Sequence, residues 1–119
     1  MNAAYVVVTL ATAAITAGIA VADLIPAGFV LANSAEVGVP RSWLPALGVV
    51  KLAGAAGLVV GLVGLPTLGI AAAAGLVLFF VGAVVTHLRA RILDNIAFPG
   101  AYLGLSTATL ALMVVHRAG

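Results

Sequence analysis

The feature that most constrains this chain is residues 52–86, a stretch of 35 uncharged residues between Lys51 and His87. A helix needs about 20 apolar residues to cross a bilayer, so this stretch is long enough for nearly two spans. Pro66 divides it within Gly64-Leu65-Pro66-Thr67, a tight connection without charge. The stretch therefore predicts an antiparallel helical hairpin, with one span at residues 43–63 and the next at residues 66–87.

The composition of the whole chain agrees with a membrane environment. Of its 119 residues, 65% are hydrophobic and 7% are charged, whereas soluble domains carry about 25% charged residues. Two further apolar stretches predict spans at residues 3–31, kinked at Pro26, and 96–115. No basic residue precedes the first stretch, so we expect it to be retained rather than cleaved as a signal peptide. The prediction is one transmembrane domain over residues 1–119, an all-α bundle of four transmembrane helices with antiparallel up-down topology.

Several classes of function are disfavoured by the residue content. The net charge of +2 comes from scattered residues, whereas nucleic-acid binding needs a basic patch. The absence of cysteine excludes disulfides and thiolate metal sites. His87 and His116 should lie about 30 Å apart on opposite membrane faces, so they cannot share a metal ion. We therefore expect no nucleic-acid partner, no metal and no cofactor.

The charged residues of the predicted spans converge at one end of the bundle. Four spans place the loops at residues 33–42 and 88–95 on the same side, together with Asp23, Lys51 and His87. Lys51 lies roughly 12 Å below Trp43 along its helix. A charge at mid-bilayer costs about 2.5–3.5 kcal/mol unless it faces the protein interior or water. Asp23 is accordingly the expected counter-ion of Lys51.

These groups suggest a polar pocket that opens at one membrane face. In this hypothesis Asp23, Lys51 and His87 perform acid/base chemistry or bind an anionic or quinone-like head group. The ligand-binding candidates at the same end are Asp94, Asn95 and Trp43. The structural alternatives are that Lys51 snorkels to the interface or pairs with Asp23 without further function, that His87 is an interfacial residue, and that Trp43 is a membrane anchor.

The chain resembles the DoxX-like family of small four-helix membrane proteins over nearly its whole length. The residues that carry the resemblance are 51–58 (KLAGAAGL), 66–76 (PTLGIAAAAGL), His87 and 94–99 (DNIAFP). The resemblance implies a four-helix bundle in the bacterial plasma membrane. It also implies a link to redox complexes or to receptor assembly, which family members have been assigned. Without cysteine or a haem-ligand pair, this chain is not expected to carry a redox centre of its own.

Two functions of different classes remain open at this stage. The first is a membrane protein that binds a lipophilic small molecule and isomerises or cyclises it by proton transfer, with Lys51 or Asp23 as acid and His87 as base. The second is a non-catalytic subunit or assembly factor of a redox-type membrane complex, or a homodimer. It rests on small residues at four-residue spacing: Ala14 and Gly18, Gly57 and Gly61, Gly100 and Gly104. A transporter is a weaker third, because four short helices would have to dimerise to enclose a path.

The arginines indicate an orientation in the membrane. Arg41, Arg89 and Arg91 lie on the side of the loops at residues 33–42 and 88–95, whereas Arg117 lies on the other side. Cytoplasmic loops carry an excess of Lys and Arg. The expected orientation therefore places these two loops, and the pocket with them, on the cytoplasmic side.

Overall fold

All regular structure in the described part of the chain is helical. The computed structural model describes residues 2–93 and 96–118. The helices are α1 (Ala3–Leu24), α2 (Gly28–Glu36), the 3₁₀ turn η1 (Arg41–Trp43), α3 (Leu44–Leu62), α4 (Pro66–Ala90) and α5 (Ala97–Ala118). Four of these segments are long and apolar enough to cross a membrane: Ala3–Leu24, Arg41–Leu62, Pro66–Ala90 and Ala97–Arg117. The all-α fold with four membrane-spanning helices is thus confirmed.

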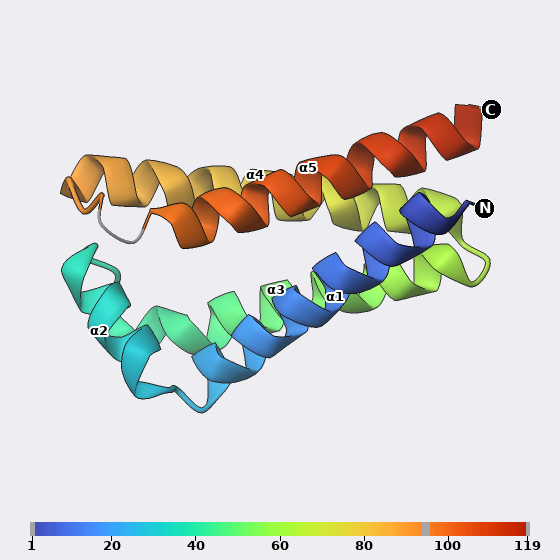
Figure 1. The fold of residues 1–119 in the computed structure, drawn as a ribbon. Coiled ribbons are helices and arrows are strands. Elements are labelled where there is room, and N and C mark those ends of the chain that lie inside the picture. Colours follow the sequence, from blue (N-terminus) through green and yellow to red (C-terminus); the bar gives the residue numbers. More distant parts are fainter. Residues whose placement is uncertain (1, 94–95, 119) are drawn as a thin grey trace.

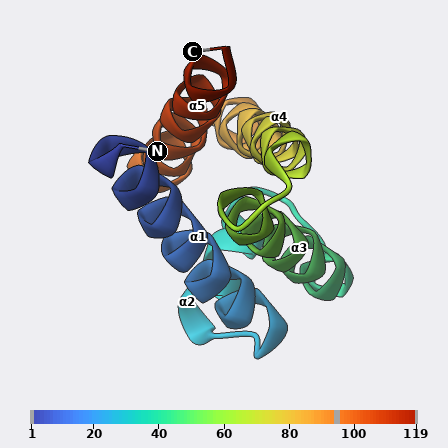
Figure 2. The same cartoon turned by 90° about the vertical axis from the view of Figure 1, so that its right-hand side faces the viewer.

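The long helices form two layers, α1 with α3 and α4 with α5 (Figures 1 and 2). Successive long helices run in opposite directions along the long axis, and both termini lie at the same end (Figure 1). The molecule measures 43 Å along this axis, close to the roughly 40–45 Å thickness of a bilayer with its head groups. Many large apolar side chains are exposed on the outer faces, for example Val63 at 77% and Leu78 at 74%. The outer surface of the bundle therefore suits contact with lipid.

The first predicted span, residues 3–31, is wrong as a single kinked helix. Helix α1 ends at Leu24, and Pro26 follows a cis peptide bond with Ile25. Proline has no N–H to donate and its ring clashes with the preceding turn, so the helix does not continue through it. The chain turns there, and residues 28–36 form the separate helix α2. Part of the predicted loop at residues 33–42 is therefore helical.

The other predicted boundaries differ by only a few residues. Helix α3 begins with Leu44 and Pro45, and α4 begins at Pro66, where a missing N–H costs little. The last residue of α4 is Ala90. The next residue, Arg91, has a φ of 58°, the left-handed conformation that terminates helices. Helix α5 begins at Ala97 and runs to Ala118. The positions of Pro45 and Pro66 therefore predicted the beginnings of α3 and α4 to within a residue or two.

Near the turn that joins them, the backbones of α3 and α4 are in direct contact. A Cβ atom built on Gly61 would lie 2.5 Å from the Cα atom of Gly69, and one on Gly57 would lie 2.6 Å from the Cβ atom of Ala72. By contrast, a Cβ atom on Gly18, Gly100 or Gly104 would meet nothing within 4 Å. Of the small-residue pairs found in the sequence, only Gly57 and Gly61 therefore pack within this chain.

Helices α1 and α5 meet through polar side chains near the termini. The hydroxyl groups of Thr12 and Thr109 are 2.9 Å apart, and the rings of Tyr5 and His116 have centroids 4.7 Å apart. Interhelical hydrogen bonds of this kind help to hold membrane helices together, because lipid provides no hydrophobic drive between them. We call these four residues the α1–α5 clasp. It lies in the half of the bundle that carries the termini.

Candidate functional site

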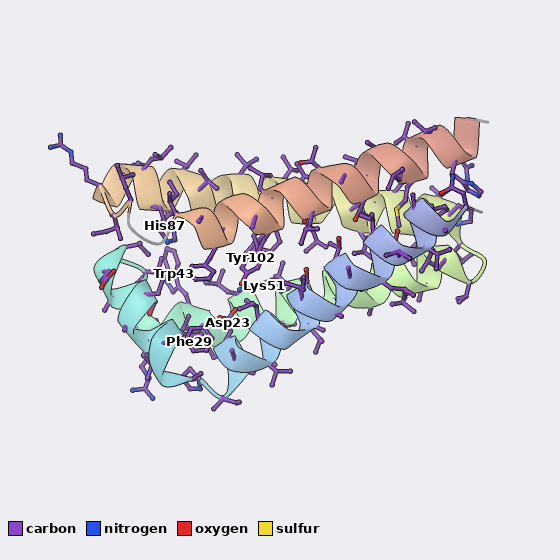
Figure 3. All side chains as sticks on the ribbon, viewed as in Figure 1. Asp23, Phe29, Trp43, Lys51, His87 and Tyr102 are labelled. Carbon is purple, nitrogen blue, oxygen red and sulfur yellow. The ribbon has the colours of Figure 1, made fainter. Side chains whose placement is uncertain are left out.

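The principal cavity lies at the end of the bundle opposite the termini. It has a volume of about 790 Å³ and is lined by residues of all five α-helices and of η1. This is within the range of roughly 300–1,000 Å³ that is usual for small-molecule sites. Figure 3 shows Asp23, Phe29, Trp43, Lys51, His87 and Tyr102 gathered at this end of the bundle, and all six line the cavity. Four of these are candidate residues from the sequence, namely Asp23, Trp43, Lys51 and His87.

A buried ion pair forms the most polar part of the cavity wall. The Nζ atom of Lys51 lies 2.5 Å from the Oδ2 atom of Asp23. Both residues are almost completely buried, at 7% and 4% exposure. Asp23 belongs to the last turn of α1, and Lys51 to the second turn of α3, so the pair joins two helices of one layer. The expected pairing of these two charges therefore occurs in the structure.

The aromatic ring of Phe79 also contacts the lysine. The Nζ atom of Lys51 lies 5.4 Å from the centroid of this ring, within the distance at which a cation is attracted to a ring face. Phe79 belongs to α4, in the layer opposite α3. The ammonium group is thus held between a carboxylate of one layer and an aromatic ring of the other. This arrangement offsets part of the cost of burying the charge.

His87 lines the cavity from the last turns of α4. Its Nδ1 atom is 2.9 Å from the carbonyl oxygen of Ala83, and its Nε2 atom is 3.3 Å from the Oδ1 atom of Asn33. A carbonyl oxygen can only accept a hydrogen bond, so Nδ1 carries the proton and donates it. The Oδ1 atom of Asn33 is also only an acceptor, so in the neutral ring the contact at Nε2 is a hydrogen bond when the Asn33 amide is rotated by half a turn and its NH₂ group donates to Nε2. His87 is therefore oriented through both ring nitrogens, by the carbonyl oxygen of Ala83 and by the side chain of Asn33.

Six aromatic side chains contribute to the apolar wall, beside aliphatic ones. They are Phe29, Trp43, Phe79, Phe80, Phe98 and Tyr102. Phe80 is buried between Phe79 and Tyr102, with ring centroids 5.3 and 5.4 Å away. Phe29, Trp43 and Phe98 are exposed by 63%, 57% and 64% and lie at the rim. The cavity thus has polar groups at its base and aromatic rings toward its opening.

Helix α2 supplies cavity residues that sequence reasoning missed. Asn33 contacts His87, and Val30, Ser34 and Val37 are buried against the cavity. The last three stand at positions i, i+4 and i+7, the spacing of a buried helix face. That spacing could have identified α2 in the sequence, but it was hidden by assigning residues 28–31 to the first span and 33–42 to a loop.

Asp94 and Asn95 fall outside the described residues. His116 belongs to the last turn of α5 and contacts Tyr5, so it lies far from His87 at the other end of the bundle. Within residues 2–93 and 96–118, no three His, Cys, Asp or Glu side chains gather in a way that could hold a metal ion. The charged and imidazole side chains of the described cavity lining are Asp23, Lys51 and His87, beside the hydroxyl group of Tyr102.

Comparison with known proteins gives one match. The family model described as the DoxX-like family matches residues 7–109. Neither the curated proteins nor the solved structures gave a match. The matched range includes α3 and α4 in full and the larger part of α1 and of α5, and with them Asp23, Lys51 and His87. This multi-pass membrane protein belongs to the DoxX-like family.

Proposed function

We propose that this protein binds a lipophilic small molecule with a neutral, quinone-like polar head in the cavity between its helix layers. The observation that carries the proposal is the combination of a 790 Å³ cavity, aromatic walls and a buried Lys51–Asp23 pair. A few convergent polar groups in a largely apolar cavity are typical of small-molecule sites. The ion pair provides the polar contact, and the aromatic rings provide the apolar surface.

The neutrality of the head group follows from the charge of the pair. Lys51 is already matched by Asp23 at 2.5 Å, so an anionic ligand would have to compete with a carboxylate in place. An ammonium group has three N–H donors, and a carbonyl oxygen can accept a second hydrogen bond without displacing Asp23. The pair therefore favours a neutral carbonyl over the anionic head group that the sequence left open.

The depth of the pair favours a ligand dissolved in the membrane. Lys51 lies roughly 12 Å along the helix from Trp43, which is at the interfacial end of α3. A phospholipid keeps its charged head group at the interface, whereas a quinone-like head partitions into the apolar region. A ligand that reaches Lys51 must therefore have a head group soluble at that depth.

Proton transfer is the chemistry that we assign to the bound ligand. Lys51 would donate a hydrogen bond to the carbonyl oxygen, and His87 would take a proton from a saturated carbon attached to the far side of the conjugated head, because His87 lies about 12 Å farther along α4 than Phe79, which contacts Lys51. Return of the same proton to a more distant carbon of the conjugated system completes an isomerisation with no net gain or loss. For this role Nε2 would exchange its contact with Asn33 for the ligand, while the contact of Nδ1 with the Ala83 carbonyl keeps the ring in place.

The first test uses the only tryptophan of the chain as a reporter. Trp43 lines the cavity, so a quinone bound there should quench its fluorescence. We expect saturable quenching when a benzoquinone is titrated into phosphatidylcholine vesicles that contain the protein. Hydrogen bonds to charged groups contribute about 1.5–3 kcal/mol, so Lys51→Met should weaken binding about tenfold or more.

Two further variants control this measurement. Arg117→Gln removes an exposed charge from the far end of the bundle and should leave the titration unchanged. Asp23→Asn combined with Lys51→Met removes both buried charges and should weaken binding while keeping the fold. Quenching that rises linearly without saturation, and equally in all variants, would reject the site.

A second candidate is a subunit or assembly factor of a larger membrane complex. The favouring observation is that Gly18 on α1 and Gly100 and Gly104 on α5 have open space beside them on outward faces. Such faces allow another helix to approach closely. Gly100→Leu with Gly104→Leu should abolish cross-linking to a partner or a second copy in native membranes, and Gly75→Leu, at an equally open glycine on α4, tests whether the effect is specific to the α5 face. Unchanged cross-linking in the first variant would reject this candidate.

A further inference from the structure

The two helix layers contact each other more extensively along one long side of the bundle than along the other. On one side α3 and α4 pack from the Gly61–Gly69 contact as far as the contact of Lys51 with Phe79, and beyond it both helices line the cavity. On the other side α1 and α5 have the least extensive packing of the neighbouring long helices. Figure 1 shows α1 and α5 close together near the termini and diverging toward the other end.

On this second side, α1 and α5 contact each other through the α1–α5 clasp. Thr12 contacts Thr109, and Tyr5 contacts His116, in the half that carries the termini. Both contacts have the same register, since the step of seven residues from Tyr5 to Thr12 matches the step of seven back from His116 to Thr109. Beyond the clasp, Ile19 and Asp23 of α1 and Phe98 and Tyr102 of α5 line the cavity. The cavity therefore separates the two helices in the half where they diverge.

The side chains along this separation change from polar to apolar toward the outside. Asp23 is 4% exposed at the base, Ile19 and Tyr102 are half-buried, and Phe98 is 64% exposed. Both helices are membrane-spanning, so an opening between them faces the acyl chains rather than water. A polar base with an apolar opening matches a molecule whose polar head enters first and whose hydrocarbon tail trails behind.

We propose that the diverging halves of α1 and α5 form a lateral portal, through which a membrane lipid with a single long hydrocarbon tail inserts its head. The tail remains between Ile19 and Phe98 and passes out into the bilayer. This inference rests on the proposed function of the cavity and names the class of its ligand: a neutral-headed lipid such as a polyprenyl quinone. It predicts that the length of the tail is not limited by the volume of the cavity.

The absence of cysteine allows a clean test by cross-linking. Ile19→Cys with Phe98→Cys, joined by a short bifunctional maleimide, closes the portal. Tyr5→Cys with His116→Cys, joined in the same way, locks the clasp and serves as the matched control. Each locked protein in phosphatidylcholine vesicles is titrated with a tailless benzoquinone and with a benzoquinone that carries a long polyprenyl tail, using Trp43 quenching.

The portal predicts that the first lock abolishes saturable binding of the tailed quinone and leaves binding of the tailless quinone within twofold. The clasp lock should leave both unchanged. Phe98→Ala, which widens the opening without a cross-link, should speed association of the tailed quinone several-fold in stopped-flow measurements. Equal binding of the tailed quinone with the portal locked and unlocked would overturn the portal alone. Absence of saturable binding of either quinone to the unlocked protein would overturn the proposed function together with it.

Discussion

At the scale of single residues, the Lys51–Asp23 pair distinguishes this chain from an ordinary helical bundle. Breaking a buried ion pair leaves an uncompensated charge, whereas replacing both partners by neutral groups of similar shape removes that penalty. The two kinds of variant should therefore separate a structural cost from a functional one. The pairing of Lys51 with Asp23 was predictable, because a charged side chain inside an apolar span needs an opposite charge to offset its desolvation.

We expect Lys51→Met to destabilise the protein by about 3–5 kcal/mol, because Asp23 is then buried without its partner. Adding Asp23→Asn should restore most of that loss. Thermal unfolding in mild detergent, followed by circular dichroism, measures both. If the double variant were no more stable than Lys51→Met alone, the pair would not be the source of the penalty.

At the scale of elements, glycine positions decide how closely α3 and α4 approach. Gly61→Ala should destabilise the bundle by about 1–3 kcal/mol, because the added Cβ atom meets the backbone of Gly69, which cannot move aside easily. Gly75→Ala is the matched control on α4, where a Cβ atom would meet nothing within 4 Å. The midpoint of unfolding in a denaturing detergent compares the two. Equal midpoints would mean that the close approach contributes nothing to stability.

The elements also show how far sequence reasoning extends. Long apolar stretches divided by Pro66 and Pro45 identified α3 and α4, because spans have a minimum length and proline favours the first helical turn. The same reasoning failed at Pro26, where the sequence alone does not decide between a kink and a break. The break creates α2, and with it Asn33 and the aromatic rim at Phe29. The Lys51–Asp23 pair at the base of the cavity was therefore predictable from the sequence, whereas helix α2 and its contribution to the cavity were not.

At the scale of the whole molecule, the arrangement of the spans predicts which surfaces face each side of the membrane. Ser42, before α3, and Thr67, at the start of α4, are exposed at opposite ends of the bundle. The excess of arginine near Ser42 predicts that this end is cytoplasmic. In intact cells that express the protein in their plasma membrane, a membrane-impermeant maleimide should label Thr67→Cys, and should label Ser42→Cys only after lysis. Labelling in the reverse order would invert the orientation.

The close contact of Gly61 with Gly69 has a consequence for the membrane itself. Together with the buried side chains of Leu58 and Leu76, it fills the half of the bundle that carries the termini. Among the described residues, the cavity is therefore bounded at one end by packed side chains and opens toward the other end and toward one long side of the bundle. Because this half separates the cavity from the end that carries the termini, we expect the bundle to be tight to ions, which an ion-flux measurement in vesicles would check.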